Sequence, residues 1–170
     1  RYCGREDLII HVHHHKLKAS NANASIQSEA REVRYAFFEE CMKIYNYTSV
    51  LTAHHADDRI ETALFNFIRG SGLSGMASIK EQRDHFLRPM IRVFKEEIAE
   101  YADRYMVPFR SDQSNFSTED YSRNFLRHKV LPLFESVFPN YRMRMSRSIH
   151  NLNADNSLLQ SLLEHQRKII

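Results

Sequence analysis

The 170-residue sequence predicts an α/β protein, built on a parallel sheet with flanking helices and followed by a helical segment. Residues 8–12 and 48–53 are short apolar runs rich in β-branched side chains, and an amphipathic helical stretch over 25–45 separates them. A strand, a helix and a second strand form a βαβ unit, in which the strands are parallel and the crossover is right-handed. Three of the four glycines fall within residues 70–75, where the helix after the second strand is expected to end.

The second strand leads directly into the stretch that carries most of the candidate chemistry. It breaks at His54 and His55, and the helix that follows has Asp57 and Asp58 in its first turn, with Glu61 one turn beyond Asp58. Each group alone is more often structural, because acids cap helices and histidines at strand ends usually find a partner. Two histidines, three acids and three glycines within about two dozen residues exceed what caps require. Because they follow the carboxyl end of a strand, we predict an active site here.

The second half of the chain is predicted to be mostly helical. Residues 86–91 are short and extended, since Pro89 excludes a helix interior, and an amphipathic helix is predicted over 94–106. Residues 111–120 are rich in turn formers and predict a polar loop. A long helix is predicted from Pro139, a natural first helical residue, to the C-terminus.

A further helix is predicted after the polar loop, and it carries two arginines four residues apart. Arg123 and Arg127 share one face, with Asn124 beside them. Two guanidinium groups on one face are suited to gripping a phosphate or a carboxylate, and the alternative is that both face water. From Arg123 to Arg147 there are six arginines and lysines but a single acid, Glu135. This region is either the footprint of a polyanionic partner or a solvated helix face.

Composition excludes several classes of protein. An apolar fraction of 42% and a charged fraction of 26% are typical of a soluble globular domain, and no run approaches the length of a membrane span. Cys3 and Cys41 form neither a CxxC pair nor a disulfide framework, which is typical of cytoplasmic proteins. Residues 13–15 are consecutive histidines, but side chains in a strand alternate between faces, so no metal site held by the protein alone is predicted.

Both ends of the chain lead us to expect a longer protein. The chain does not begin with methionine, and the strand predicted from residue 8 would make it start almost directly within a sheet, which is rare for a chain of this size. At the other end, the long predicted helix reaches Ile170 without a cap or a stop signal. We therefore expect a preceding segment and a following domain.

Short motifs spread over nearly the whole chain occur in an order that one family shares. The motifs are His11-Val-His-His14, Ala30-Arg-Glu-Val-Arg-Tyr35, His54-His-Ala-Asp-Asp-Arg-Ile-Glu-Thr62, Arg69-Gly-Ser-Gly-Leu-Ser-Gly75, Leu87-Arg-Pro89, Asp112-Gln-Ser-Asn115, Tyr121-Ser-Arg-Asn-Phe-Leu-Arg127 and Leu131-Pro132. The HHxDDxxET block followed by RGxGLxG is the most specific of them. The sequence therefore resembles the tRNA(Ile)-lysidine synthetase family, a bacterial branch of the PP-loop (N-type) ATP pyrophosphatases.

The resemblance implies a fold and a reaction. The fold would be a partial Rossmann-like, adenine nucleotide alpha hydrolase-like sheet. The reaction would use ATP and Mg²⁺, the metal entering with the nucleotide, to adenylate the wobble cytidine of a tRNA(Ile) with a CAU anticodon. Free L-lysine would then displace AMP and leave lysidine, which changes the codon read from Met to Ile. The family also implies a cytoplasmic enzyme with no membrane partner and allows a homodimer.

The resemblance further implies roles for individual residues near the start of the central helix. Asp58 and Glu61 would bind the ammonium group of lysine and serve as the general base, since lysine must lose a proton before it attacks. His54 and Asp57 would support these carboxylates or face the metal.

Other residues are expected near the nucleotide and the RNA. Gly70 and Gly72, with Arg69 beside them, would let backbone amides approach the nucleotide closely. The remaining contacts, to the tRNA or to the adenylate, are expected from Arg123, Asn124 and Arg127. The target base must be splayed out of its loop to be reached.

Two features depart from the family pattern. The family's nucleotide-binding loop, serine-glycine-glycine-x-aspartate-serine, occurs nowhere in these 170 residues. About ten residues separate His15 from Ile26, where the family has a longer crossover, so we expect that a segment is missing near His14 and His15. The predicted division is a PP-loop ATPase domain over 1–115, a helical segment closing the active site over 116–138, and a linker helix over 139–170.

Two other functions stay open from the residues alone. Another PP-loop tRNA-modifying ATPase is one, although a 2-thiolation enzyme would normally carry CxxC cysteines, and this sequence has none. A non-catalytic RNA-binding fragment is the other. It would explain the basic helices but not the carboxylates beside the glycine turn.

Overall fold

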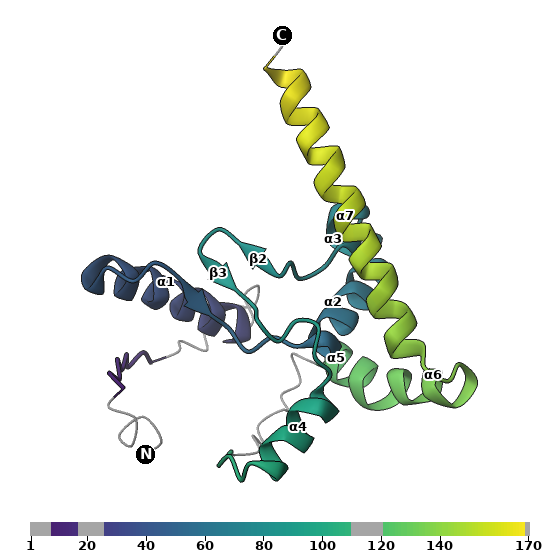
Figure 1. The fold of residues 1–170 in the computed structure, drawn as a ribbon, viewed down its shortest axis with the longest axis horizontal. Helices are drawn as coiled ribbons and strands as arrows, with labels where there is room; N and C mark the ends of the chain where they lie inside the picture. Colours follow the sequence, from purple (N-terminus) through teal and green to yellow (C-terminus); the bar gives the residue numbers. More distant parts are fainter. Residues whose placement is uncertain (1–7, 17–25, 110–120, 169–170) are drawn as a thin grey trace.

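The computed structural model describes residues 8–16, 26–109 and 121–168, which form several helices and one small sheet (Figure 1). The elements in chain order are α1 (Ile26–Tyr45), β1 (Val50–Leu51), α2 (Ala56–Ile68), α3 (Leu73–Met76), β2 (Gln82–Arg83), β3 (Phe86–Leu87), α4 (Lys95–Arg104), α5 (Tyr121–Phe125), the π-helical turn η3 (Leu126–Val130), α6 (Leu131–Val137) and α7 (Tyr141–Arg167). The polar loop predicted at 111–120, Ser25 at the start of the helix predicted over 25–45, and the boundary predicted at 115/116 lie outside the described residues.

The sheet contains the predicted parallel pair, but with a different partner. β1 pairs in parallel with β3, in the register Val50 to Phe86, and β2 pairs with β3 in the antiparallel direction. The strand order is β1-β3-β2. α1 packs beside this sheet through Tyr35, whose ring centroid lies 4.9 Å from that of Phe86.

The prediction of a strand at residues 8–12 is wrong. Residues 8–16 adopt no regular secondary structure, and the apolar side chains of Ile9 and Val12 are exposed. An apolar run becomes a strand only where its backbone pairs with a neighbour, and none of the described segments pairs with this one. The segment instead contacts the end of α1, where the ring of His11 stacks on Tyr45 with centroids 3.9 Å apart. The helix of the predicted βαβ unit, over 25–45, is confirmed as α1.

The core lies where α2 meets the C-terminal helices. Ile60 and Ala63 of α2 are buried against Leu131, Tyr141 and Ile149, which come from α6 and α7. α7 also packs on α3, and its C-terminal end projects away from the rest of the molecule (Figure 1). No helix among the described residues is both long and apolar enough to cross a membrane. The packing places α2, and the acids at its start, at the centre of the described structure.

The helix predicted after the polar loop is interrupted at residues 126–130. α5 passes into the π-helical turn η3, which carries Arg127, and only then into α6. Pro132 accounts for the interruption, because it lacks an N–H and its ring crowds the carbonyl of His128, four residues earlier. The widened turn fixes the direction in which Arg127 leaves the helix.

The long C-terminal helix starts later than the sequence predicts. α7 begins at Tyr141 rather than Pro139, and Asn140 before it has a φ of 64°. The chain must reverse between α6 and α7, and asparagine is among the residues that best tolerate this left-handed conformation. Tyr141 is then buried against Phe134, with the ring centroids 5.7 Å apart.

The end of α2 depends on one glycine. Gly70 has a φ of +75°, and a Cβ added there would meet no atom within 4 Å. We expect Gly70→Ala to lower the free energy of unfolding by about 1 kcal/mol through backbone strain alone. Gly72→Ala is the matched control, because Gly72 has equal space and a negative φ of −70°. Equal melting temperatures for the two variants would contradict the prediction.

Candidate active site

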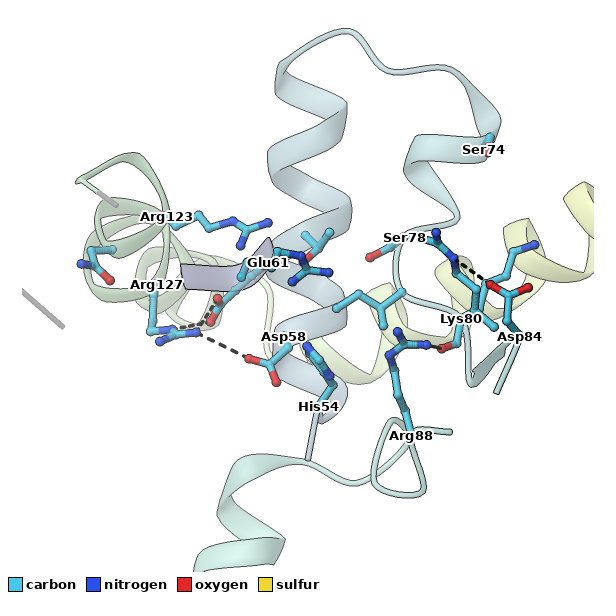
Figure 2. Close-up of a pocket in the computed structure, with 15 residues that line it drawn as sticks. His54, Asp58, Glu61, Ser74, Ser78, Lys80, Asp84, Arg88, Arg123 and Arg127 are labelled. Atoms are coloured by element: carbon cyan, nitrogen blue, oxygen red, sulfur yellow. Dashed lines mark hydrogen bonds and ion pairs between the residues drawn. The ribbon is translucent and has the colours of Figure 1, made fainter. Parts of the chain in front are cut away.

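A cavity of about 720 Å³ opens beside the first turns of α2 (Figure 2). α2 supplies Asp58, Glu61 and Thr62, and the other sides are formed by α1, the segment before α2, the segments that follow α2, and α5 with η3. The remaining lining residues are Arg31, His54, Ser74, Ser78, Ile79, Lys80, Arg83, Asp84, Arg88, Arg123, Asn124 and Arg127. Besides Asp58 and Glu61, four of the predicted site residues line this cavity, namely His54, Arg123, Asn124 and Arg127, whereas Asp57, Arg69, Gly70 and Gly72 do not.

Glu61 and Arg127 form the most closely held contact in the cavity. Arg127 donates from Nε to Oε1 of Glu61 at 2.6 Å and from Nη2 to Oε2 at 2.7 Å. The Glu61 side chain is 8% exposed and that of Arg127 is 35% exposed. Such a two-point pair has a fixed geometry and is stronger than a single hydrogen bond between neutral groups. The pair joins α2 to η3 across 66 residues of sequence.

Asp58 both accepts a hydrogen bond at the N-terminus of α2 and lines the cavity. Its Oδ2 accepts a hydrogen bond of 3.0 Å from the backbone N–H of His55, which satisfies a donor at the N-terminus of α2. Its Oδ1 lies 3.6 Å from Nη2 of Arg127. One arginine therefore bridges the two carboxylates that the sequence predicts as a pair.

His54 borders the same carboxylates from the end of β1. Its Nδ1 lies 2.9 Å from the hydroxyl oxygen of Thr52, and this contact orients the ring. Burial lowers the pKa of His54 below its ordinary value of 6.5; Asp58 opposes this shift, whereas Arg88 and Arg31 add to it. The imidazole is therefore mainly neutral at pH 7, as a proton acceptor or a neutral donor must be.

The lowered pKa of His54 predicts a stability change in mild acid. The unfolded chain takes up this proton near pH 6.5 and the folded chain only at lower pH, so stability present above pH 6.5 is lost as the pH falls below it. Because other histidines also titrate, the comparison is with His54→Gln. We expect the variant's melting temperature to fall less than that of the parent between pH 7.5 and 5.5, in the range set by histidine titration. An equal fall in melting temperature for His54→Gln and the parent would contradict this assignment.

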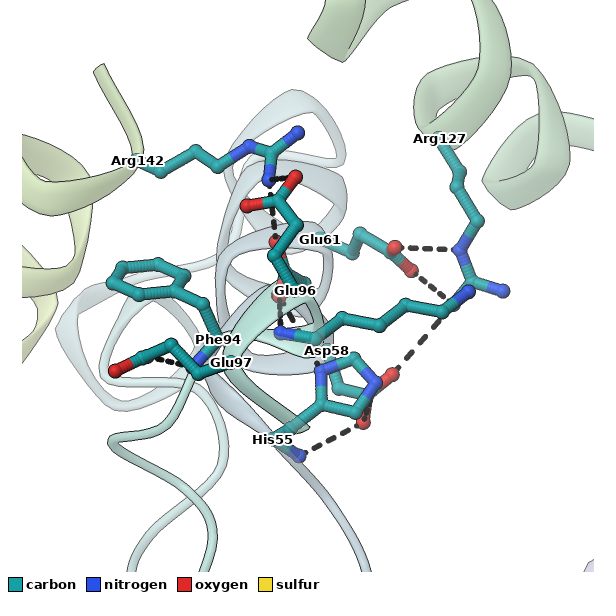
Figure 3. Close-up of polar contacts among 10 residues, drawn as sticks. His55, Asp58, Glu61, Phe94, Glu96, Glu97, Arg127 and Arg142 are labelled. Atoms are coloured by element: carbon teal, nitrogen blue, oxygen red, sulfur yellow. Dashed lines mark hydrogen bonds and ion pairs between the residues drawn. The ribbon is translucent and has the colours of Figure 1, made fainter. Parts of the chain in front are cut away.

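Asp57 lies outside the cavity, although the sequence groups it with the catalytic acids. Its Oδ2 accepts a 2.8 Å hydrogen bond from the backbone N–H of Lys95, the first residue of α4. Its Oδ1 lies 3.7 Å from Nη1 of Arg142, which also pairs with Glu96. Figure 3 shows Arg142 and Arg127 reaching this end of α2 from opposite sides. The contacts of Asp57 join α2, α4 and α7.

The residues predicted near the nucleotide do not line the cavity either. Gly70 and Gly72 lie beyond the C-terminal end of α2, whereas the cavity lies beside its first turns. Arg69 lies over the ring of Phe65, 5.2 Å from the centroid, and Arg123 lies over the same ring at 5.3 Å. Arg123 and Asn124 do line the cavity. The nucleotide role of the glycine turn stays a prediction.

Several residues that line the cavity are not among those that the sequence predicts for the site. They are Arg31, Ser74, Ser78, Lys80, Arg83, Asp84 and Arg88. Arg88 belongs to the Leu87-Arg-Pro89 motif, which carries the family resemblance but gives no indication of where the side chain points. Its burial next to the cavity depends on how β3 pairs with β2 and β1.

The charge of the cavity suits an anionic ligand. Six of the lining residues are arginines or lysines and three are acids, and two of those acids already contact Arg127. A nucleoside triphosphate or an RNA strand fits this excess of positive charge. Within the described ranges, no group of three or more His, Cys, Asp and Glu side chains could hold a metal ion.

Comparison with known proteins places the fold. The family model described as a PP-loop domain matches residues 1–134. The chain also resembles a solved structure, the U34-tRNA thiolase NcsA from Methanococcus maripaludis with its [4Fe-4S] cluster. The TM-score is 0.68 at 14% identity, over 90% of this chain and 54% of that one. At that identity the likeness shows the fold alone, and it agrees with the predicted α/β class.

Curated relatives are similar over most of this chain. A tRNA(Ile)-lysidine synthase from Parabacteroides distasonis is 37% identical over 150 residues, which cover 88% of this chain and 34% of the relative. Those from Thermosipho africanus and Chlorobaculum tepidum are 36% and 40% identical, covering 80% and 70% of this chain and 32% and 36% of the relatives. The chain spans about a third of the length of these relatives. Since the family model extends over residues 1–134 of the 170, the chain belongs to the PP-loop domain family.

Proposed function

We propose that this chain is part of an enzyme that ligates lysine to the wobble cytidine of a tRNA(Ile) with a CAU anticodon, using ATP. The observation that carries the proposal is the pair of carboxylates, Asp58 and Glu61, held together by Arg127 in a cavity rich in cations. The similarity to tRNA(Ile)-lysidine synthases over most of the chain supports the choice of substrates. When bound, ATP, with its Mg²⁺, supplies the activation of the base.

The carboxylates meet the two requirements of a lysine nucleophile. The ammonium group must be bound, and it must lose a proton before its nitrogen can attack. Glu61 and Asp58 already hold one cationic group, the guanidinium of Arg127, between them. We propose that the lysine ammonium joins this cluster beside Arg127 and gives its proton to one of the two carboxylates. His54, neutral and near Asp58, would orient the second acid or accept the proton onward.

The other lining residues suit an RNA that presents one base to the cavity. Arg123 lies on the Arg127 side of α2, and Lys80 and Arg88 lie on the other (Figure 2). Asn124, which follows Arg123 in α5, also lines the cavity. A nucleobase that is to react must be out of its stack, and the groups around it must then bind the displaced backbone. Free L-lysine, ATP with Mg²⁺ and the tRNA form the proposed substrate set; the homodimer and the cytoplasmic location stay predictions.

Lysine incorporation into RNA tests the proposal. The full-length protein that contains this chain is incubated with ATP, Mg²⁺, radiolabelled lysine and a transcript of the CAU-anticodon tRNA(Ile), and label in the RNA is counted. We expect ATP-dependent label that is absent when the wobble cytidine is replaced by uridine. A folded protein that binds both ATP and the transcript but incorporates no lysine would refute the proposal. It would favour another tRNA modification by a member of the same family.

A further inference from the structure

One end of the cavity is distinct from the carboxylate cluster. Figure 2 shows Ser78, Lys80, Asp84 and Arg88 on the side of α2 opposite to Arg127. These residues come from the loop after α3, from the β2–β3 hairpin and from the segment directly after β3. They play no part in the lysine chemistry proposed above.

Arg88 is the least expected residue of this end, because its charge is buried and the described residues provide no counter-charge. It is 6% exposed, its Nη1 donates to the carbonyl oxygen of Lys80 at 2.9 Å, and its Nε finds no hydrogen-bond partner in the described part of the chain. Among the described residues, no carboxylate lies within ion-pair distance of it. A buried charge with incomplete partners is unfavourable, so such groups normally pair with an acid or with a bound anion.

The neighbours of Arg88 add positive charge rather than neutralise it. Lys80 and Arg83 also line this end, and Asp84 is the single acid among the described residues that line it. Nε of Arg83 lies 3.6 Å from Asp84, with both side chains more than 70% exposed, so water screens this pair strongly. At the other end, by contrast, two carboxylates face Arg127. The excess of positive charge is therefore concentrated around Arg88.

We propose that Arg88, Lys80 and Arg83 form a phosphate subsite, which holds a backbone phosphate of the RNA next to the base that enters the cavity. A phosphate supplies the missing counter-charge and accepts hydrogen bonds from a guanidinium fork. The exposed Arg83 places the subsite at the mouth of the cavity, where a polymer can pass, whereas an enclosed pocket would suit a small ligand. The choice of RNA rests on the proposed function.

Equilibrium binding of an RNA hairpin with a CAU loop tests the subsite, without ATP or lysine. Binding is measured over a series of salt concentrations for Arg88→Gln, Arg83→Gln and the parent protein. Arg92→Gln is the matched control, because Arg92 is exposed, pairs with Glu81 at 2.8 Å and does not line the cavity. ATP binding is measured on the same proteins to separate an RNA phosphate from a nucleotide phosphate.

We expect Arg88→Gln to weaken RNA binding about tenfold and Arg83→Gln about threefold, each with a salt slope lower by about 1. The ATP affinity of both variants should match that of the parent within about twofold, and so should the RNA affinity of the Arg92→Gln control. RNA affinities and slopes equal to those of the control would overturn the subsite, and a loss confined to ATP would overturn its assignment to RNA. If Arg88→Gln does not fold, Arg83→Gln decides. Loss of RNA binding in a protein that never incorporates lysine would uphold the subsite while the proposed function fails.

Discussion

Replacing Glu61 with glutamine is expected to abolish lysine incorporation and to lower the free energy of unfolding by about 2 kcal/mol. The pair with Arg127 would lose its charge while the shape of the side chain is kept. Removing one partner of a buried pair costs about 3–5 kcal/mol, and the smaller figure here reflects the third of Arg127 that remains in water. Incorporation should fall by at least about a hundredfold, because both the ammonium site and a candidate base are lost.

A double variant separates the two effects of Glu61→Gln. Arg127→Gln added to Glu61→Gln removes the unpaired guanidinium, so we expect part of the lost stability to return, with a coupling of about 1–2 kcal/mol in a double-mutant cycle. Lysine incorporation should stay absent in the double variant. Urea unfolding and the incorporation assay measure the two quantities independently. If Glu61→Gln retained near-parental incorporation, the lysine ammonium would have to bind elsewhere.

The central helix could be predicted because its signals are local. His54 and His55 after a strand, Asp57 and Asp58 in a first turn and Gly70 at the end define α2 within fifteen residues or so, and the structure confirms its bounds as Ala56–Ile68. The positive φ at Gly70 likewise follows from a residue type and its place after a helix.

The partners of these elements could not be predicted in the same way, because they are distant in sequence. The apolar run at residues 8–12 and the run that becomes β3 both fit a strand, and the sequence alone does not say which one pairs with β1. Glu61 and Arg127 were both candidate site residues, yet only the folded chain shows that they contact each other. Arg88 has no local signal at all, since burial of its charge depends on how the β2–β3 hairpin closes.

Adjacent acids at the start of α2 illustrate the same limit. From the sequence, Asp57 and Asp58 differ by one position in a helix, which is about 100° of rotation, and either could face a ligand. In the structure Asp58 faces the cavity and Arg127, while Asp57 faces Lys95 and Arg142. His55 lies between them, with Nδ1 3.6 Å from Asp57 and Nε2 3.5 Å from Asp58. The rotation along the helix therefore separates one acid suited to chemistry from one suited to packing.

Replacing Asp58 or Asp57 with asparagine is expected to have opposite effects on lysine incorporation and on stability. Asp58→Asn should reduce lysine incorporation at least about a hundredfold with little change in melting temperature, since an asparagine oxygen can still accept the hydrogen bond from His55. Asp57→Asn should keep incorporation within about threefold while lowering the free energy of unfolding by about 1 kcal/mol, because the charge facing Arg142 and the start of α4 is lost. Each variant is the control for the other, as both remove one charge from the same helical turn. Loss of incorporation in Asp57→Asn at an unchanged melting temperature would show that Asp57 acts on the substrates, and α4 or α7 would then have to move to let it reach the cavity.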